Sequence, residues 1–255
     1  MKNLFLVTLF TINIYAMQPY EIWTVVPGTW ASGELWWNLG GDFFCALQKA
    51  AEESGAKVLP FAWSGKNNEK SRIAAAKSFA HLLSCFEPQT AINIVAHSHG
   101  ATVALCACQM LAMRKPVRKI KALYALGVPI HEDFYRPNML VIEKLYNLFS
   151  FNDGIQTIFD SKRVFTKQPG IVNLRVMVDG QEPTHTTLHC PIIAAWLPML
   201  EHISCCDQGL LSFYREKHPE VVFDVAFEKL LASDKPIDLQ ALIDPRGILN
   251  YHRKR

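Results

Sequence analysis

The sequence predicts an α/β fold with a mostly parallel, doubly wound sheet. Three observations lead to this prediction. Short apolar segments alternate along the chain with longer segments of helical spacing. Residues 90–96 are almost wholly apolar, as expected for a central parallel strand that is covered on both faces. Residues 100–114 are apolar on every side, which predicts a helix buried against such a sheet. Alternating strands and helices build parallel sheets through right-handed crossovers.

The first half of the chain supports this prediction element by element. Residues 21–28 form an apolar run that ends in Pro-Gly, which is typical of a strand followed by a turn. Residues 33–54 are expected to be helical because their apolar side chains recur every three or four positions. These side chains are Trp36, Leu39, Phe43, Leu47 and Ala50. Residues 57–63 predict a second strand, which Pro60 makes irregular or peripheral. Residues 68–86 predict an amphipathic helix.

The second half continues the alternation beyond the buried helix. Residues 120–130, 142–151 and 171–179 predict three further strands, and residues 189–200 predict a helix that packs back on the sheet. Functional groups of parallel sheets gather at the carboxyl ends of the strands. The search for a site therefore concentrates on the residues that follow each strand.

Length and composition limit the remaining possibilities. The chain has 255 residues, half of them hydrophobic and 19% charged, which fits one globular domain or one domain with a small appendage. A net charge of +3 is too weak to indicate a nucleic-acid partner. The seven cysteines suggest neither a disulfide framework nor a metal site.

The N-terminal segment allows two interpretations. Lys2 followed by an apolar run to Ala16 is typical of a secretory signal peptide, which predicts a secreted or extracytoplasmic protein. The segment could also be retained as an anchor. A first β-strand is the competing interpretation, because the run is rich in strand formers, and a chain with free thiols would then be cytoplasmic.

The strand at residues 90–96 ends at a serine between two histidines. Small residues lie two positions before and two positions after Ser98, at Ala96 and Gly100. A nucleophile elbow needs small residues there, because the backbone is strained and neighbouring chains approach closely. The helix that follows would direct its N-terminal N–H groups towards the reacting oxygen. A polar turn into a buried helix is the alternative.

These residues resemble the α/β-hydrolase family, whose signature is G-x-S-x-G. The motif reads Ala96-His97-Ser98-His99-Gly100 here, with alanine in place of the first glycine, as in some bacterial lipases of the family. The resemblance covers about residues 21–200. It implies the α/β-hydrolase type of sheet and the chain order serine, acid, histidine. The short stretch 131–138 leaves no room for a large cap domain.

The resemblance places the acid and the base in two later loops. Asp153 follows the strand at 142–151 and is the expected acid, although Asn-Asp-Gly is also an ordinary turn. Asp160 is the alternative acid, and Asp179 is a weaker one. His185 lies in the loop before the last helix and is the expected base, with His189 as the alternative. The two histidines could also be a metal pair, but they lack the glutamate of H-E-x-x-H, so we expect no metal.

The oxyanion hole and the substrate pocket follow from the same comparison. The backbone N–H of His99 is one expected donor, and that of Thr29, or alternatively Trp30, is the other. His97 and His99 are expected to pack at the rim rather than to act as the base. Trp30 and Trp36 are candidates for an acyl pocket or a membrane-facing rim; packing against the sheet is the alternative for Trp36.

Together these features predict a serine hydrolase that cleaves a carboxylic ester, as lipases and esterases do, through an acyl-enzyme and without a cofactor. The alternatives are a thioesterase or amidase of the same fold, or an inactive hydrolase-like protein that binds a lipid or a protein. Association with a membrane surface is compatible with these predictions. We expect a signal peptide at residues 1–16, a hydrolase domain at 17–200 and a helical extension at 201–255. The sequence leaves the oligomeric state open.

Overall fold

The computed structural model describes residues 21–155, 162–202, 208–213 and 222–224. Within them, one sheet has the strand order β2-β1-β3-β4-β5-β6-β7-β8. All neighbouring strands are parallel except β7 and β8, which are antiparallel. The strands are β1 (Glu21–Val26), β2 (Lys57–Pro60), β3 (Ala91–His97), β4 (Ile120–Leu126), β5 (Ile142–Phe149), β6 (Ile171–Val178), β7 (Gln208–Phe213) and β8 (Val222–Asp224).

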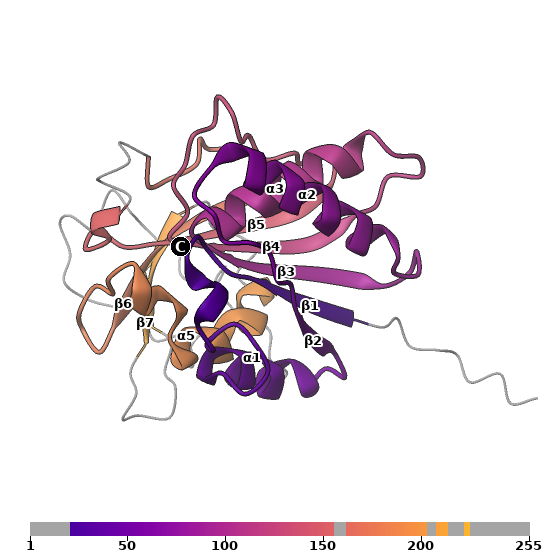
Figure 1. Ribbon diagram of the computed structural model, residues 1–255. Helices are drawn as coiled ribbons and strands as arrows, with labels where there is room; N and C mark the ends of the chain where they lie inside the picture. Colours follow the sequence, from indigo (N-terminus) through magenta and orange to yellow (C-terminus); the bar gives the residue numbers. More distant parts are fainter. Residues whose placement is uncertain (1–20, 156–161, 203–207, 214–221, 225–255) are drawn as a thin grey trace, which may run out of the picture.

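Helices cover both faces of the sheet (Figure 1). The helices α2 (Glu69–Ser84) and α3 (His99–Ala112) pack side by side on one face. The helices α1 (Asp42–Glu52) and α5 (Pro191–Trp196) pack together on the other. Each face has its own apolar core, because the central strands carry buried side chains in both directions. The predicted α/β class with a mostly parallel, doubly wound sheet is therefore confirmed.

Short 3₁₀ helices complete the described secondary structure. They are η1 (Ala31–Gly33), η2 (Thr186–His189) and η3 (Leu197–His202). Asn68 starts α2 because its side chain accepts a hydrogen bond from the N–H of Ser71 at 2.9 Å, which satisfies one donor of the first turn. The strand β2 pairs only with β1 and lies at the edge of the sheet, as Pro60 predicts.

The helix predicted for residues 33–54 is shorter in the structure. The helix α1 begins only at Asp42, and turns precede it. The cause lies in two glycines: Gly40 has a φ of +84°, and a Cβ at Gly41 would lie 1.9 Å from the carbonyl oxygen of Leu35. Leu39 is consequently 70% exposed and does not belong to the apolar face. Helical spacing alone did not detect this interruption.

The C-terminal part also differs from the prediction. We expected helices within residues 201–255, but the two segments described there beyond His202 are the strands β7 and β8. They extend the sheet beyond β6, through parallel pairing of β7 and an antiparallel β7–β8 pair. Backbone pairing to an existing sheet edge decided their conformation, and the local apolar pattern did not indicate it.

Several predictions fall on residues outside the described part. These are the signal peptide at residues 1–16, the alternative acid Asp160, and the rest of the expected C-terminal extension. The boundaries of the predicted domains remain predictions for the same reason. In the part of the chain that the structure describes, no helix is both long and apolar enough to cross a bilayer.

Candidate active site

The elbow around Ser98 has the strained backbone that the sequence predicts. Strand β3 ends at His97, helix α3 begins at His99, and Ser98 between them has a φ of 53° and a ψ of −132°. Such a conformation costs a non-glycine residue about 1–3 kcal/mol and persists only where the surroundings enforce it. The N–H of Ser98 donates a hydrogen bond to the carbonyl oxygen of Leu126 at 2.9 Å, which ties the elbow to the end of β4.

Two glycines allow the end of β1 to pack directly on the elbow. A Cβ at Gly100 would lie 2.5 Å from the carbonyl oxygens of both Val26 and Pro27. A Cβ at Gly28 would lie 2.9 Å from the Cβ of Ser98. Real Cβ atoms do not approach other atoms this closely, so the contact requires glycine at both positions. The loop after β1 therefore lies against the serine.

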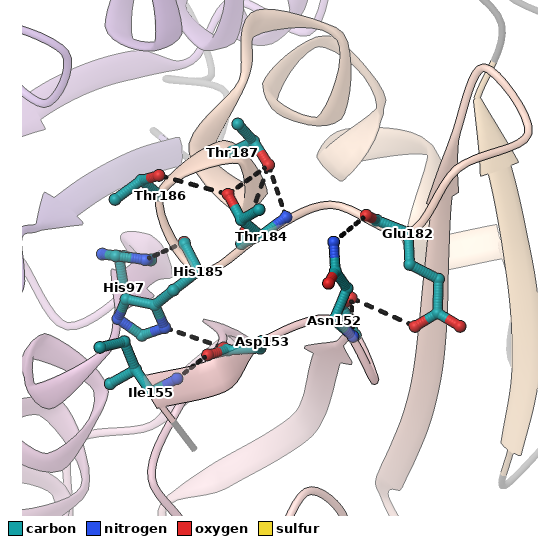
Figure 2. A network of polar contacts seen from close by, with 10 residues as sticks. His97, Asn152, Asp153, Ile155, Glu182, Thr184, His185, Thr186 and Thr187 are labelled. Carbon is teal, nitrogen blue, oxygen red and sulfur yellow. Dashed lines mark hydrogen bonds and ion pairs between the residues drawn. The ribbon is translucent and has the colours of Figure 1, made fainter. Parts of the chain in front are cut away.

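A buried carboxylate and a histidine meet next to this elbow. The Nδ1–H of His185 donates a hydrogen bond to Oδ2 of Asp153 at 2.8 Å (Figure 2). The side chain of Asp153 is fully buried and that of His185 is 13% exposed. Oδ1 of Asp153 also accepts the N–H of Ile155 at 3.0 Å. Because the proton of neutral His185 is then on Nδ1, its Nε2 is the nitrogen that can accept a proton.

The structure does not close the contact between serine and histidine. Within the described residues, no hydrogen bond joins Ser98 Oγ to His185 Nε2. In unliganded enzymes such contacts are often long and tighten only with substrate. The structure thus brings Asp153 and His185 into direct contact and places Ser98 at the neighbouring strand end.

The alternative base, His189, has a different environment. Its ring stacks on Trp36, with 4.1 Å between ring centroids and 12° between planes. Burial lowers the pKa of His189 to about 4, so the ring is neutral near pH 7. His189 is the last residue of η2, one helical turn after His185. Its stacking partner is thus the indole ring of Trp36, whereas Asp153 is bound by His185.

His97 lies at the centre of this group of rings. Its Nε2–H donates a hydrogen bond to the backbone oxygen of His185 at 2.9 Å (Figure 2). Burial, together with the charges of His185 and His189, lowers the pKa of His97 well below 6.5. A carbonyl oxygen can only accept, so the proton of the neutral His97 ring is on Nε2. This nitrogen is therefore a donor to the base-bearing loop.

The expected oxyanion residues, Thr29 and His99, contact each other. Thr29 Oγ1 and His99 Nδ1 are 3.3 Å apart. Burial is the main cause that lowers the pKa of His99 to about 4, helped by the charges of nearby Arg72, His185 and His131. The N–H of Trp30, the alternative donor, donates instead to the carbonyl oxygen of Gly65 at 2.9 Å. This contact favours Thr29 over Trp30.

The two tryptophan candidates are placed differently. Trp30 is 71% exposed and has a φ of 62°. Trp36 is part of the packing beside the site, since it stacks on His189 and meets Phe43 edge-on at 5.4 Å. In the described residues, no group of three or more His, Cys, Asp or Glu side chains could hold a metal ion.

Sequence reasoning missed two residues near the acid and the base. Gly127 follows β4 with a φ of +58°, and a Cβ there would lie 2.9 Å from Oδ2 of Asp153 and 3.2 Å from Nδ1 of His185. A glycine directly after a predicted strand was the available signal. Glu182 bridges the two loops, as described below. A lone glutamate in a loop carries no such signal.

We predict that the buried histidines make folding stability depend on pH. In the unfolded chain they have a pKa near 6.5, whereas His99 and His189 have a pKa of about 4 in the folded chain. Between these values the unfolded state binds more protons, so the free energy of unfolding falls as the pH falls from about 6.5 to about 4. Urea titrations at several pH values should show this slope. His189→Phe should keep the stacking and make the slope shallower; an unchanged slope would contradict the assignment.

The fold and the elbow together define the class of the protein. A parallel sheet covered by helices, with a strained serine between a central strand and a buried helix, is the α/β-hydrolase fold. By sequence, no family model and no curated protein matches this chain.

Solved structures with a similar fold include three proteins described as hydrolases or related to them. The chain is similar to a cutinase-like protein from Cryptococcus sp., with a TM-score of 0.34 and 17% identity over 44% of this chain and 54% of the other. It is also similar to a metagenomic carboxyl esterase, with a TM-score of 0.37 and 14% identity over 57% and 55% of the two chains. A hydrolase of the alpha/beta superfamily from Xanthomonas campestris pv. campestris has a TM-score of 0.43 and 10% identity, over 70% and 94%. This chain spans about half the length of the first two.

Proposed function

We propose that this protein is a serine hydrolase that cleaves carboxylic esters, with Ser98 as nucleophile, His185 as base and Asp153 as acid. The observation that carries the proposal is the 2.8 Å hydrogen bond from His185 Nδ1–H to the fully buried carboxylate of Asp153. A buried carboxylate that orients an imidazole next to a strained serine is the arrangement that activates a hydroxyl.

The proposed reaction has two halves. His185 Nε2 takes the proton of Ser98 Oγ, and this oxygen attacks the ester carbonyl carbon. The tetrahedral intermediate collapses when His185 returns the proton to the leaving alcohol, which leaves an acyl group on Ser98. A water molecule then gives a proton to His185 and attacks the acyl carbon, and the second collapse releases the acid and restores Ser98. Asp153 stabilises the imidazolium in both halves.

The negative oxygen of both intermediates would be stabilised by backbone N–H groups. We assign these to Thr29, in the loop that lies against Ser98, and to His99, the first residue of α3. As the first residue of the helix, His99 does not donate to an intrahelical i−4 carbonyl, and its N–H lies at the positive end of the helix dipole. Removing one such donor typically costs about 100- to 1,000-fold in rate.

An exposed apolar surface near the elbow supports an ester with an apolar acyl group. The loop after β1 carries three large apolar side chains that face solvent, namely Trp30, Leu35 and Leu39. We assign Trp30 to the rim of the acyl site. A lipid substrate, or contact of this rim with a membrane surface, would use the same side chains.

The first test is covalent labelling by a fluorophosphonate, which reacts with an activated serine. We expect the wild-type protein to be labelled and Ser98→Ala to remain unlabelled, because the alanine variant lacks the attacking oxygen. Thr102→Ala, which removes a buried hydroxyl from the same helix, is the matched control and should still be labelled. A folded wild-type chain that stays unlabelled would refute the enzyme and leave a binding protein of the same fold. With a labelled protein, p-nitrophenyl esters of increasing length, compared with thioesters and amides, identify the substrate.

A further inference from the structure

The candidate acid and base are carried by two loops that leave the sheet side by side. Strands β5 and β6 are parallel neighbours, with Phe149 paired to Arg175. The acid Asp153 comes four residues after Phe149, and His185 comes after a loop at the end of β6. The distance between Asp153 and His185 therefore depends on how these two loops are held relative to each other.

Glu182 binds all three residues that separate β5 from Asp153. Its carboxylate oxygen Oε2 accepts hydrogen bonds from Ser150 Oγ, at 3.2 Å, and from the N–H of Phe151. Its backbone oxygen accepts a hydrogen bond from Asn152 Nδ2 at 3.1 Å (Figure 2). Since Glu182 lies three residues before His185, it connects the acid-bearing loop to the base-bearing loop directly.

Arg175 anchors this connection to the sheet. Its guanidinium forms an ion pair with Oε1 of Glu182, and the two side chains are 24% and 15% exposed. The same guanidinium lies 4.8 Å from the centre of the Phe151 ring. Hydrogen bonds to charged groups that are partly shielded from water are stronger and more directional than neutral ones. The carboxylate of Glu182 is thus held between β6 and the loop before Asp153.

We propose that Glu182 is a positioning residue that sets the Asp153–His185 hydrogen bond by joining the two loops. This inference rests on the proposed function for its catalytic meaning, but its geometric content can be measured separately. Glu182 binds neither the His185 ring nor Ser98 through any hydrogen bond or ion pair that the described residues show. Its influence on the reaction therefore passes through the positions of the two loops.

The test observes the hydrogen bond itself by proton NMR. The His185 Nδ1–H proton, bound to a carboxylate, should give a resonance well downfield of the amides, which Asp153→Asn identifies by removing it. We expect Glu182→Ala to broaden or abolish this resonance and to slow fluorophosphonate labelling by about 100-fold, the cost of a displacement of about 1 Å. Glu182→Gln keeps an acceptor for the Phe151 N–H and should lose less of both. Circular dichroism establishes which variants are folded.

Glu132 provides a matched control. Its side chain is also 15% exposed, accepts bonds from the N–H of Thr166 at 3.1 Å and its hydroxyl at 2.7 Å, and pairs with Lys162 at 3.9 Å. Glu132→Ala therefore removes a similar carboxylate without touching either loop, and should leave the downfield resonance unchanged. A wild-type resonance in both folded Glu182 variants would overturn the inference. A normal resonance in an unlabelled wild-type protein would instead refute the proposed enzyme.

Discussion

Replacing His185 with alanine is expected to lower ester hydrolysis and fluorophosphonate labelling by about five orders of magnitude, the typical cost of losing the base of a triad. No other described ring can replace it. The Nε2 proton of His97 is donated to the backbone of His185, and His189 is stacked on Trp36. Without His185, Ser98 has no group to receive its proton.

The comparison with His189 makes this prediction specific. We expect His189→Ala to change kcat/KM less than tenfold, because it removes stacking on Trp36 but no contact to Asp153. Both variants should be measured with the same p-nitrophenyl ester under matched conditions, after urea titration has shown that each is folded. A loss confined to His189→Ala would reverse the assignment of the base. Equal and small losses in both variants would contradict a histidine base altogether.

Replacing Gly100 with alanine is expected to destabilise the fold by about 3 kcal/mol or more, at the upper end of overpacking costs. The new Cβ would lie 2.5 Å from the carbonyl oxygens of Val26 and Pro27, and backbone atoms cannot rotate away as a side chain can. Either α3 must move from the sheet or the loop after β1 must move from Ser98. We therefore expect the remaining folded protein to be labelled more slowly as well.

Gly33→Ala serves as the control for this prediction. A Cβ at Gly33 would meet nothing within 4 Å, and the residue is exposed in η1. Urea denaturation should show a clearly lower midpoint for Gly100→Ala and an almost unchanged midpoint for Gly33→Ala. Equal midpoints would mean that α3 accommodates the extra methyl group, and the elbow would then be less tightly packed than the distances indicate.

Most of the fold could be predicted from local pattern. Residues 90–96 are apolar throughout because a central parallel strand is covered on both faces, and β3 occupies almost the same range. The buried helix after Ser98 was equally clear, because few helices are apolar on every side. Local pattern failed where the outcome depended on distant atoms. The Leu35 carbonyl oxygen excludes a side chain at Gly41, and the edge of β6 pairs with β7.

The candidate site divides in the same way. The sequence by itself determined the elbow at Ser98, with its small neighbours, and the chain order of serine, acid and histidine, because these are properties of a few consecutive residues or of their order. Only the tertiary structure decided that His185 rather than His189 contacts Asp153, and that Glu182 joins the loops that carry them. The reason is physical. Two histidines four positions apart look alike along the chain, and the neighbouring strand ends, brought together by folding, determine which ring meets a buried carboxylate.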